Sequence, residues 1–152
     1  MIKINMITIA IKTFKELSTE ELYSILQLRS EVFVVEQNCV YQDIDFKDQN
    51  ALHVIGVKDD AIVAYTRCFK PGFYFEEASI GRVVVKDKER KYGYGYDIMN
   101  ASIKAIKDVY DTDTIKISAQ TYLNTFYTNL GFSNIGEGYL EDGIPHIAMI
   151  KS

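Results

Sequence analysis

The stretch between residues 80 and 110 constrains the fold more than any other part of this chain. Near its start lies an apolar run, residues 83–85, which is typical of a mostly buried strand. A charged turn follows, and after it come two glycines, Gly93 and Gly95. From residue 98 onward, apolar side chains recur every three or four positions, as they do along the buried face of a helix. This stretch therefore predicts a strand, a glycine loop and a helix, in that order.

A glycine loop that leads into a helix has a chemical use. The first backbone N–H groups of a helix have no partner within the helix, and the helix dipole places partial positive charge there. Glycines let the backbone approach a ligand closely, and Arg90 and Lys91 add positive charge. Such a loop can bind a phosphate or a diphosphate. The alternative is a tight turn whose glycines only allow the strand and the helix to pack.

The spacing of the glycines excludes two common phosphate loops. A nucleoside-triphosphate loop ends in Gly-Lys-Ser or Gly-Lys-Thr, which this stretch does not contain. A dinucleotide-binding loop needs a third glycine at position 98, where the chain has Ile98. What remains is Arg90-x-x-Gly93-x-Gly95 after a valine-rich strand. This pattern resembles the loop that binds the diphosphate of acyl-CoA in the GNAT acetyltransferases.

Length and composition exclude several classes of protein. With 152 residues, the chain is expected to form one domain, residues 1–152. A net charge of −4 argues against nucleic acid as a partner, and no apolar run approaches the length of a membrane span. Cys39 and Cys68 are far apart, so reduced thiols and a cytoplasmic location are expected, and no metal site is indicated. A homodimer is compatible with this composition.

Local patterns predict the remaining elements. Ser18 and Glu21 form a capping box, which predicts that a helix begins there. Gly131 predicts the end of a short helix over residues 122–130. A strand is predicted at 7–14, where apolar and polar residues alternate, and it is expected at an edge of the sheet. Further strands are predicted at 51–58, 61–69, 114–120, 134–139 and 144–150.

Two arginines lie where apolar side chains are expected. Arg29 falls on the apolar stripe of the first helix, and Arg67 lies within the strand 61–69. A charge in a half-buried position needs a partner of opposite charge, so we expect carboxylates to reach both arginines. Asp43 and Asp45 are the candidates for Arg67. A structural ion pair and contact with a substrate are both open for these arginines.

A long string in the N-terminal half narrows the resemblance. It reads L-R-x-x-V-F-V-V-E-Q-x-C-x-Y over residues 28–41, with D-x-D at 43–45 and then His53. Together with G-I-P-H-I-A-M at 143–149, it resembles the ElaA-like branch of the GNAT family; Gln42 stands where many relatives have an acid. The resemblance implies an α/β (α+β) fold, a mixed twisted sheet of six to seven strands with helices on both faces. The central strands would splay apart to admit the pantetheine arm of the cofactor.

The resemblance also implies roles for individual residues. Tyr127 stands where the family places its general acid, and acetyl-CoA is the implied cofactor. The implied cofactor-binding residues are Val83, Val84, Val85, Arg90, Lys91, Tyr92, Gly93, Tyr94, Gly95, Tyr96, Gln120 and Asn124. The residues expected to bind the acceptor substrate are Arg29, Phe33, Asp43, Asp45 and His53.

The general base is the least determined part of the site. Glu36 is the first choice, because it ends the helix that should border the acceptor pocket. Asp43, Asp45, His53 and His146 remain open as alternatives. Cys39 as a nucleophile that accepts the acyl group is not favoured, because no neighbouring histidine suggests activation.

These features predict an N-acetyltransferase that moves an acetyl group from acetyl-CoA to a primary amine of a small molecule or a peptide, by direct attack on the thioester. One alternative is an acyltransferase similar to the acyl-homoserine-lactone synthases, which use an acyl carrier protein and S-adenosylmethionine. The Arg90-x-x-Gly93-x-Gly95 loop counts against it. The other alternative is a non-catalytic regulatory module that binds CoA, against which the presence of Tyr127 counts.

Overall fold

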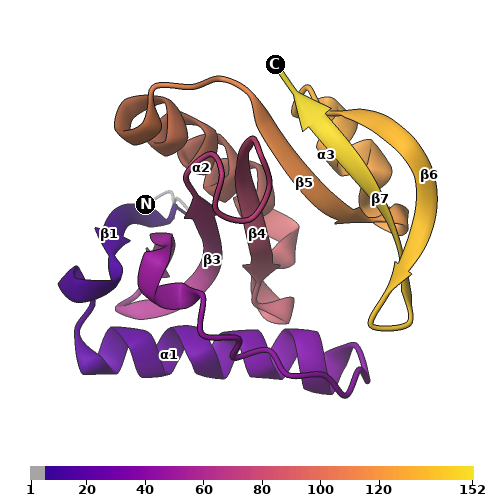
Figure 1. Cartoon of the computed structure of the whole chain (residues 1–152). Coiled ribbons are helices and arrows are strands. Elements are labelled where there is room, and N and C mark those ends of the chain that lie inside the picture. The colour runs from indigo at the N-terminus through magenta and orange to yellow at the C-terminus, as the bar shows by residue number, and fades with distance from the viewer. Residues whose placement is uncertain (1–5) are drawn as a thin grey trace.

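The computed structural model describes residues 6–152, and these residues form one seven-stranded mixed sheet with helices on both faces (Figure 1). The predicted fold class is confirmed. The strands are β1 (Thr8–Thr13), β2 (Leu52–Lys58), β3 (Ala61–Phe69), β4 (Ala78–Val85), β5 (Ile115–Gln120), β6 (Ser133–Glu141) and β7 (Ile144–Lys151). The α-helices are α1 (Thr19–Arg29), α2 (Tyr94–Tyr110) and α3 (Asn124–Asn129). Within residues 6–152, no helix is long and apolar enough to cross a membrane.

The strands lie in the order β1-β2-β3-β4-β5-β7-β6, so the predicted strand at 7–14 is an edge strand. Each neighbouring pair is antiparallel except β4 and β5, which run parallel. A parallel pair needs a crossover connection, and α2 supplies it. The hairpin between β2 and β3 turns at Asp59 and Asp60, which both have positive φ as the predicted two-residue turn requires.

The first helix begins where the capping box predicts. The Ser18 hydroxyl accepts a hydrogen bond from the backbone N–H of Glu21 at 3.0 Å, and the Glu21 carboxylate accepts one from the backbone N–H of Ser18 at 2.8 Å. After Arg29 the helix continues as a wider π-helical segment, Ser30–Glu36. Such segments are frequent at functional sites, and this one brings Phe33 and Glu36 to the wall of a cleft.

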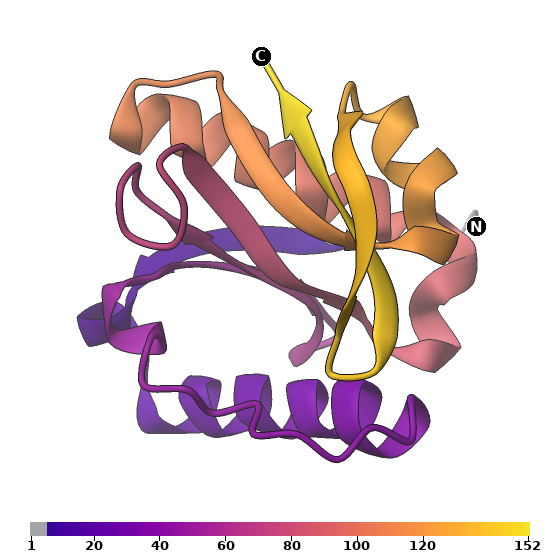
Figure 2. The same ribbon diagram turned by 45° about the vertical axis from the view of Figure 1, so that its right-hand side comes forward.

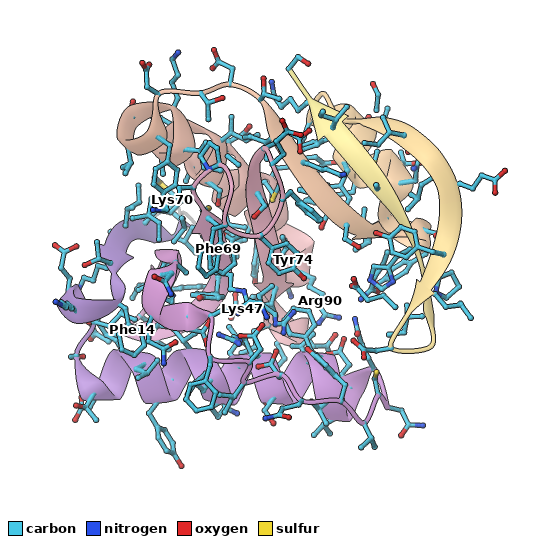
Figure 3. All side chains as sticks on the ribbon, in the orientation of Figure 1. Phe14, Lys47, Phe69, Lys70, Tyr74 and Arg90 are labelled. Carbon is cyan, nitrogen blue, oxygen red and sulfur yellow. The ribbon has the colours of Figure 1, made fainter. Side chains whose placement is uncertain are left out.

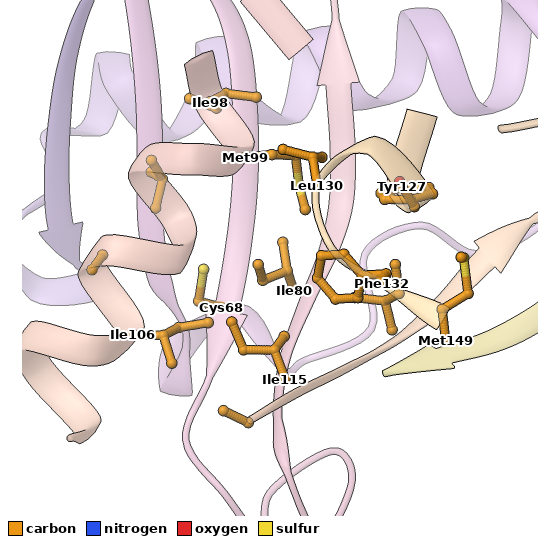
Figure 4. Close-up of a cluster of buried hydrophobic side chains, with 14 of the residues drawn as sticks. Cys68, Ile80, Ile98, Met99, Ile106, Ile115, Tyr127, Leu130, Phe132 and Met149 are labelled. Atoms are coloured by element: carbon orange, nitrogen blue, oxygen red, sulfur yellow. The ribbon is translucent and has the colours of Figure 1, made fainter. Parts of the chain in front are cut away.

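Two clusters of buried side chains hold the layers together. On one face of the sheet, α2 packs its buried residues Ile98, Met99 and Ile106 against the apolar side of β2, β3 and β4 (Figure 4). On the opposite face, α1 packs Ile25 and Leu28 against β2, β3 and β4. Figure 2 shows α1 on its own side of the sheet and α2 on the other. Burial of these apolar faces is the main driving force for the layered arrangement.

The parallel strands β4 and β5 separate soon after they meet. Only two residue pairs join them, Ala78 with Ile115 and Ser79 with Lys116. Beyond this point the pairing of β3 with β4 also shifts, and Arg82 has a φ of 48°, which non-glycine residues rarely adopt. The carboxyl ends of β4 and β5 therefore diverge, as the resemblance implied.

Candidate active site

The diverging strands frame a cleft with a volume of about 490 Å³, which is within the range of small-molecule sites. Its walls come from the π-helical segment after α1, from β4, from the glycine loop, from β5 and α3, and from the turn between β6 and β7. Figure 3 shows Tyr74 and Arg90 at the opening between β4 and the β6–β7 hairpin. Segments from the whole length of the chain thus meet at one site.

The glycine loop opens into this cleft at the start of α2. Gly93 is the N-cap residue, its φ is 75°, and no side chain caps the helix. The first N–H groups of α2 are therefore available to a ligand. A β-carbon at Gly95 would lie only 3.2 Å from the ring of Phe126, so the helix start and α3 approach each other closely here. Both glycines line the cleft, which fits a loop that holds an anion with main-chain groups.

Arg90 and Glu36 are joined across the cleft opening. Nη1 of Arg90 lies 2.7 Å from Oε2 of Glu36, and Nη2 donates to Oε1 at 3.0 Å. Nε of Arg90 also donates to the carbonyl of Val85 at 3.0 Å. The cation predicted to bind the cofactor and the carboxylate predicted to act as base are therefore ion-paired to each other. Both side chains are partly exposed.

The other residues of the loop take different positions. Tyr96 lines the cleft and stacks near Phe126, with ring centroids 4.7 Å apart. Tyr94 is buried, Tyr92 packs against it and Lys91 is exposed, and these three side chains do not line the cleft. The positions of these three side chains do not support a side-chain contact with the cofactor, so their role in binding it stays a prediction.

The final residues of β4 present backbone groups to the cleft. Val84 and Val85 pair with β3 on one side, but within residues 6–152 β4 has no strand partner on its β5 side beyond Ser79. Val83, Val84 and Val85 all line the cleft. An unpaired strand edge beside the glycine loop offers hydrogen-bonding groups to a ligand that enters between the strands.

Tyr127 lies on α3, opposite the glycine loop. It is 6% exposed, lines the cleft and packs against the rings of Phe126 and Phe132 (Figure 4). Burial raises the pKa of Tyr127, and the neighbouring Tyr122 raises it further. The phenol is therefore protonated at neutral pH, as a proton donor must be.

Gln120 and Asn124 are both predicted to contact the cofactor, but only Gln120 lines the cleft. Gln120 lines the cleft, and its amide Nε2 donates to Oε1 of Gln37 at 3.3 Å, which ties β5 to the segment after α1. The amide of Asn124 donates to Asn134 on β6 at 2.6 Å, and Asn124 is not among the residues that line the cleft.

Three arginines and three aspartates form a buried network beside the cleft, here called the arginine–aspartate cluster: Arg29, Arg67, Arg82, Asp43, Asp45 and Asp48. Arg29 is fully buried and binds Asp43 at 2.9 Å and Asp48 at 2.8 Å. The expected carboxylate partner of Arg67 is Asp45, at 2.7 Å. Arg29, Asp43 and Asp45 do not line the cleft, so their contacts support a structural ion network.

The sequence reasoning missed two members of this cluster. Asp48 bridges Arg29 and Arg67, and Arg82 lies 2.7 Å from Asp43 through its Nε. Arg82 interrupts the apolar strand at 80–85, which is the same signal that singled out Arg29 and Arg67. Arg67 and Arg82 do line the cleft.

His53 is fully buried and does not face the cleft. Its Nδ1 lies 2.6 Å from the hydroxyl of Tyr65 and its Nε2 lies 2.9 Å from the carbonyl of Asp48. Burial lowers the pKa of His53, which keeps the ring neutral at physiological pH. Of the five residues expected to bind the acceptor, Phe33 alone lines the cleft.

A second set of polar side chains lies on the side of the cleft formed by β5, β6 and β7, where Ser118, Glu141 and His146 line it. Nε2 of His146 lies 3.3 Å from Oε2 of Glu141, and Ser118 hydrogen-bonds to Tyr139. The sequence had left His146 open and had not singled out Glu141. Their proximity depends on strand order, which local patterns do not reveal. Within residues 6–152, no three His, Cys, Asp or Glu side chains are grouped as metal ligands.

Comparison with known proteins identifies the family. A family model described as an acetyltransferase (GNAT) domain matches residues 13–152. Protein ElaA of Escherichia coli K12 is 42% identical over 138 residues, which is 90% of each chain. The crystal structure of Escherichia coli ElaA superimposes with a TM-score of 0.90 at 40% identity, covering 97% of this chain and 100% of that one.

Two further structures extend the comparison. An acyl-CoA N-acyltransferase from Pseudomonas aeruginosa has a TM-score of 0.89 at 37% identity, covering 95% of this chain and 99% of that one. The acyl-homoserine-lactone synthase LasI has a TM-score of 0.78, but at 13% identity it shares the fold alone; it covers 95% of this chain and 88% of that one. The chain belongs to the GNAT acetyltransferase family, in its ElaA-like branch.

Proposed function

We propose that this protein transfers an acetyl group from acetyl-CoA to a primary amine of a small molecule or a peptide. The observation that carries the proposal is that the uncapped start of α2 and the protonated phenol of Tyr127 open into one cleft between β4 and β5. The Pseudomonas aeruginosa relative, described as an acyl-CoA N-acyltransferase, supports an acyl-CoA donor and a nitrogen acceptor.

The glycine loop fits the diphosphate of the donor. Among residues 6–152, no side chain caps the N–H groups that follow Gly93, and the close packing of Gly95 on Phe126 leaves little room for a side chain there. Arg90 lies at the same opening and can add positive charge. The pantetheine arm would then lie along the unpaired edge of β4, where Val83 to Val85 line the cleft.

The reaction needs stabilisation of negative charge at two places. The carbonyl oxygen of the thioester gains charge as the amine attacks, and backbone N–H groups at the free edge of β4 can stabilise it. The sulfur leaves as a thiolate, and the phenol of Tyr127 donates a proton to it. The acceptor amine arrives as an ammonium ion, since such amines have a pKa of about 10.4, so a base is also required.

The proposal is tested by mixing the purified protein with acetyl-CoA and a panel of primary amines, and by following the release of free thiol. Amine-dependent thiol release supports the proposal. Turnover with an acyl carrier protein and not with acetyl-CoA would instead indicate the acyl-homoserine-lactone-synthase type. Binding of acetyl-CoA without thiol release for any amine would indicate a regulatory CoA-binding module. A cytoplasmic location and a homodimer stay predictions, to be checked by cell fractionation and by light scattering.

A further inference from the structure

Among the charged side chains of residues 6–152 that line the cleft, the arginines all have ion-pair partners of opposite charge, whereas some of the carboxylates do not. Its three arginines, Arg67, Arg82 and Arg90, are each ion-paired to carboxylates. Glu141 and Asp142, at the turn between β6 and β7, also line the cleft. In the described part of the chain, residues 6–152, the one ion pair of these two carboxylates is that of Glu141 with His146. The unmatched charge at this end of the cleft is therefore negative, which suits a cationic ligand.

Strand register places His146 on the wall of the cleft that faces α1. His146 pairs with Gln120 of β5 and with Tyr139 of β6. Residues opposite each other in an antiparallel pair project to the same face of the sheet. Gln120 projects toward the segment after α1, because its amide bonds to Gln37. The imidazole of His146 therefore projects to the same side, away from the helices α2 and α3.

The hydrogen bonds of His146 define which nitrogen is basic. Nδ1 lies 2.7 Å from the carbonyl of Ile144, and a carbonyl accepts only, so Nδ1 carries the proton in the neutral ring. Nε2 then has the free lone pair. It lies 3.3 Å from Oε2 of Glu141, so a proton bound at Nε2 would form an ion pair with that carboxylate. The carbonyl of Ile144 thus orients the ring, and Glu141 would stabilise the imidazolium that forms when Nε2 takes up a proton.

The other candidates for the base are occupied. Glu36 is bound by Arg90 through both of its oxygens, and Asp43 and Asp45 belong to the arginine–aspartate cluster. His53 is fully buried and does not line the cleft. Among the five candidates, His146 is the one that lines the cleft and keeps a lone pair without a bound arginine.

Aromatic side chains line the same cleft as His146. Tyr74 and Phe75 line the same cleft, and Tyr74 stacks on Phe69 with ring centroids 5.8 Å apart. Glu141 lines this cleft too, and the pKa of Tyr74 is raised by burial and then by the charge of that carboxylate. An amine bound here would meet carboxylates at its charged end and aromatic rings along its carbon body.

We propose that this region is the acceptor subsite, that it binds a primary ammonium group carried on an apolar or aromatic body, and that His146 is the base. The inference rests on the proposed acetyl transfer. The ammonium gives one proton to Nε2 of His146, and Glu141 stabilises the imidazolium. The amine nitrogen forms a bond to the thioester carbon as the C–S bond breaks. The sulfur takes the proton of Tyr127, and the second proton lost by the nitrogen restores the phenol.

The first arm of the test compares two acceptors with the same body, 2-phenylethylamine and its weakly basic 2,2-difluoro analogue. At pH 7, His146→Gln should lower kcat/KM for 2-phenylethylamine by about 10²-fold or more, with KM for acetyl-CoA unchanged. This loss in kcat/KM should shrink to less than about tenfold for the difluoro amine, of which a far larger fraction is already neutral at pH 7, and also as the pH nears about 10. Two titratable side chains of β6 contact His146, namely Tyr139 and Glu141, whereas its pairing partner on β5, Gln120, is uncharged. An equal deficit for both amines at every pH would show a merely structural role and overturn the assignment.

The second arm does not depend on turnover. In protein labelled with ¹⁵N-histidine, 2-phenylethylamine should shift the ring signals of His146, and the isosteric 3-phenylpropanoate should not. Glu141→Gln should abolish the shift, whereas Glu137→Gln, an exposed position on the same strand, should leave it intact. Ring signals that do not respond to millimolar amine would overturn the subsite. A shift without thiol release from any amine would keep the subsite and reject acetyl transfer.

Discussion

Replacing Asp48 by asparagine should destabilise the fold more than most single substitutions. Oδ1 of Asp48 accepts from Arg29 at 2.8 Å and from Arg67 at 3.0 Å, and all three side chains are at most 7% exposed. The substitution leaves three arginines, two of them buried, with two aspartates. Breaking a buried ion pair by removing one partner costs about 3–5 kcal/mol. With a slope of about 2 kcal/mol per molar urea, the unfolding midpoint should fall by about 1.5–2.5 M.

The assay is urea unfolding of the wild type and the variant, followed by circular dichroism. Asp108→Asn is the matched control, because Asp108 pairs with Lys104 on the surface of α2, where both side chains are more than half exposed. Such a pair contributes less than about 0.5 kcal/mol. A loss below about 1 kcal/mol for Asp48→Asn would refute the view that this carboxylate compensates two buried cations.

The same cluster predicts how stability depends on pH. Burial alone raises the pKa of Asp45 and of Asp48, but the hydrogen bonds and charges of Arg67 and Arg29 outweigh it and hold both pKa values below their usual range. A carboxyl with a lowered pKa contributes stability above its unfolded pKa, about 3.9, and loses it as the pH falls toward the folded pKa. The stability difference between wild type and Asp48→Asn should therefore narrow below about pH 4. A difference that stays constant down to pH 2 would contradict this.

Three substitutions test the cleft. Tyr127→Phe should lower turnover about 10²-fold with unchanged affinity for acetyl-CoA, and unchanged turnover would remove the phenol from the mechanism. Gly93→Val should weaken acetyl-CoA binding in calorimetry, because a β-branched side chain is strained at a φ of 75° and would occupy space that is open to a ligand. Gly136→Val is its control, with a φ of 72° and similar open space on β6; equal affinity losses would reject the loop assignment. Glu36→Gln should keep turnover within about tenfold of wild type, because Arg90 holds that carboxylate; a larger loss would make Glu36 the base.

Local signals in the sequence were sufficient for much of the fold. The capping box at Ser18 and the turn at residues 59–60 depend on neighbours in the chain, and the structure has both as predicted. The glycine loop was found for the same reason. The sequence also predicted that Arg67 would have a carboxylate partner, because burying a charge in an apolar strand is costly unless an opposite charge pairs with it. The structure confirms Asp45 as that partner.

The acceptor side was harder to predict because it is built from distant segments. His146 and Gln120 face each other only because β7 inserts between β5 and β6, and no local pattern specifies that order. The bridging role of Asp48 likewise depends on how the segment before β2 folds back onto α1. Arg29 and His53 are polar residues in apolar stretches of the sequence, and the structure buries both. The sequence pattern did not show whether such a side chain lies behind the wall of the cleft or faces into it, and neither residue lines the cleft.

The brief pairing of β4 with β5 has a mechanical consequence. The sheet consists of two halves, β1–β4 and β5–β7, that share two residue pairs. On the α2 side, a continuous apolar core bridges the halves. On the α1 side, the bridging contacts are polar, between Gln37 and Gln120 and from the thiol of Cys39 to the carbonyl of Asp142 at 3.5 Å. The two halves are therefore held together chiefly by the apolar core on the α2 side, and the rim of the cleft on the α1 side is joined by weaker polar contacts.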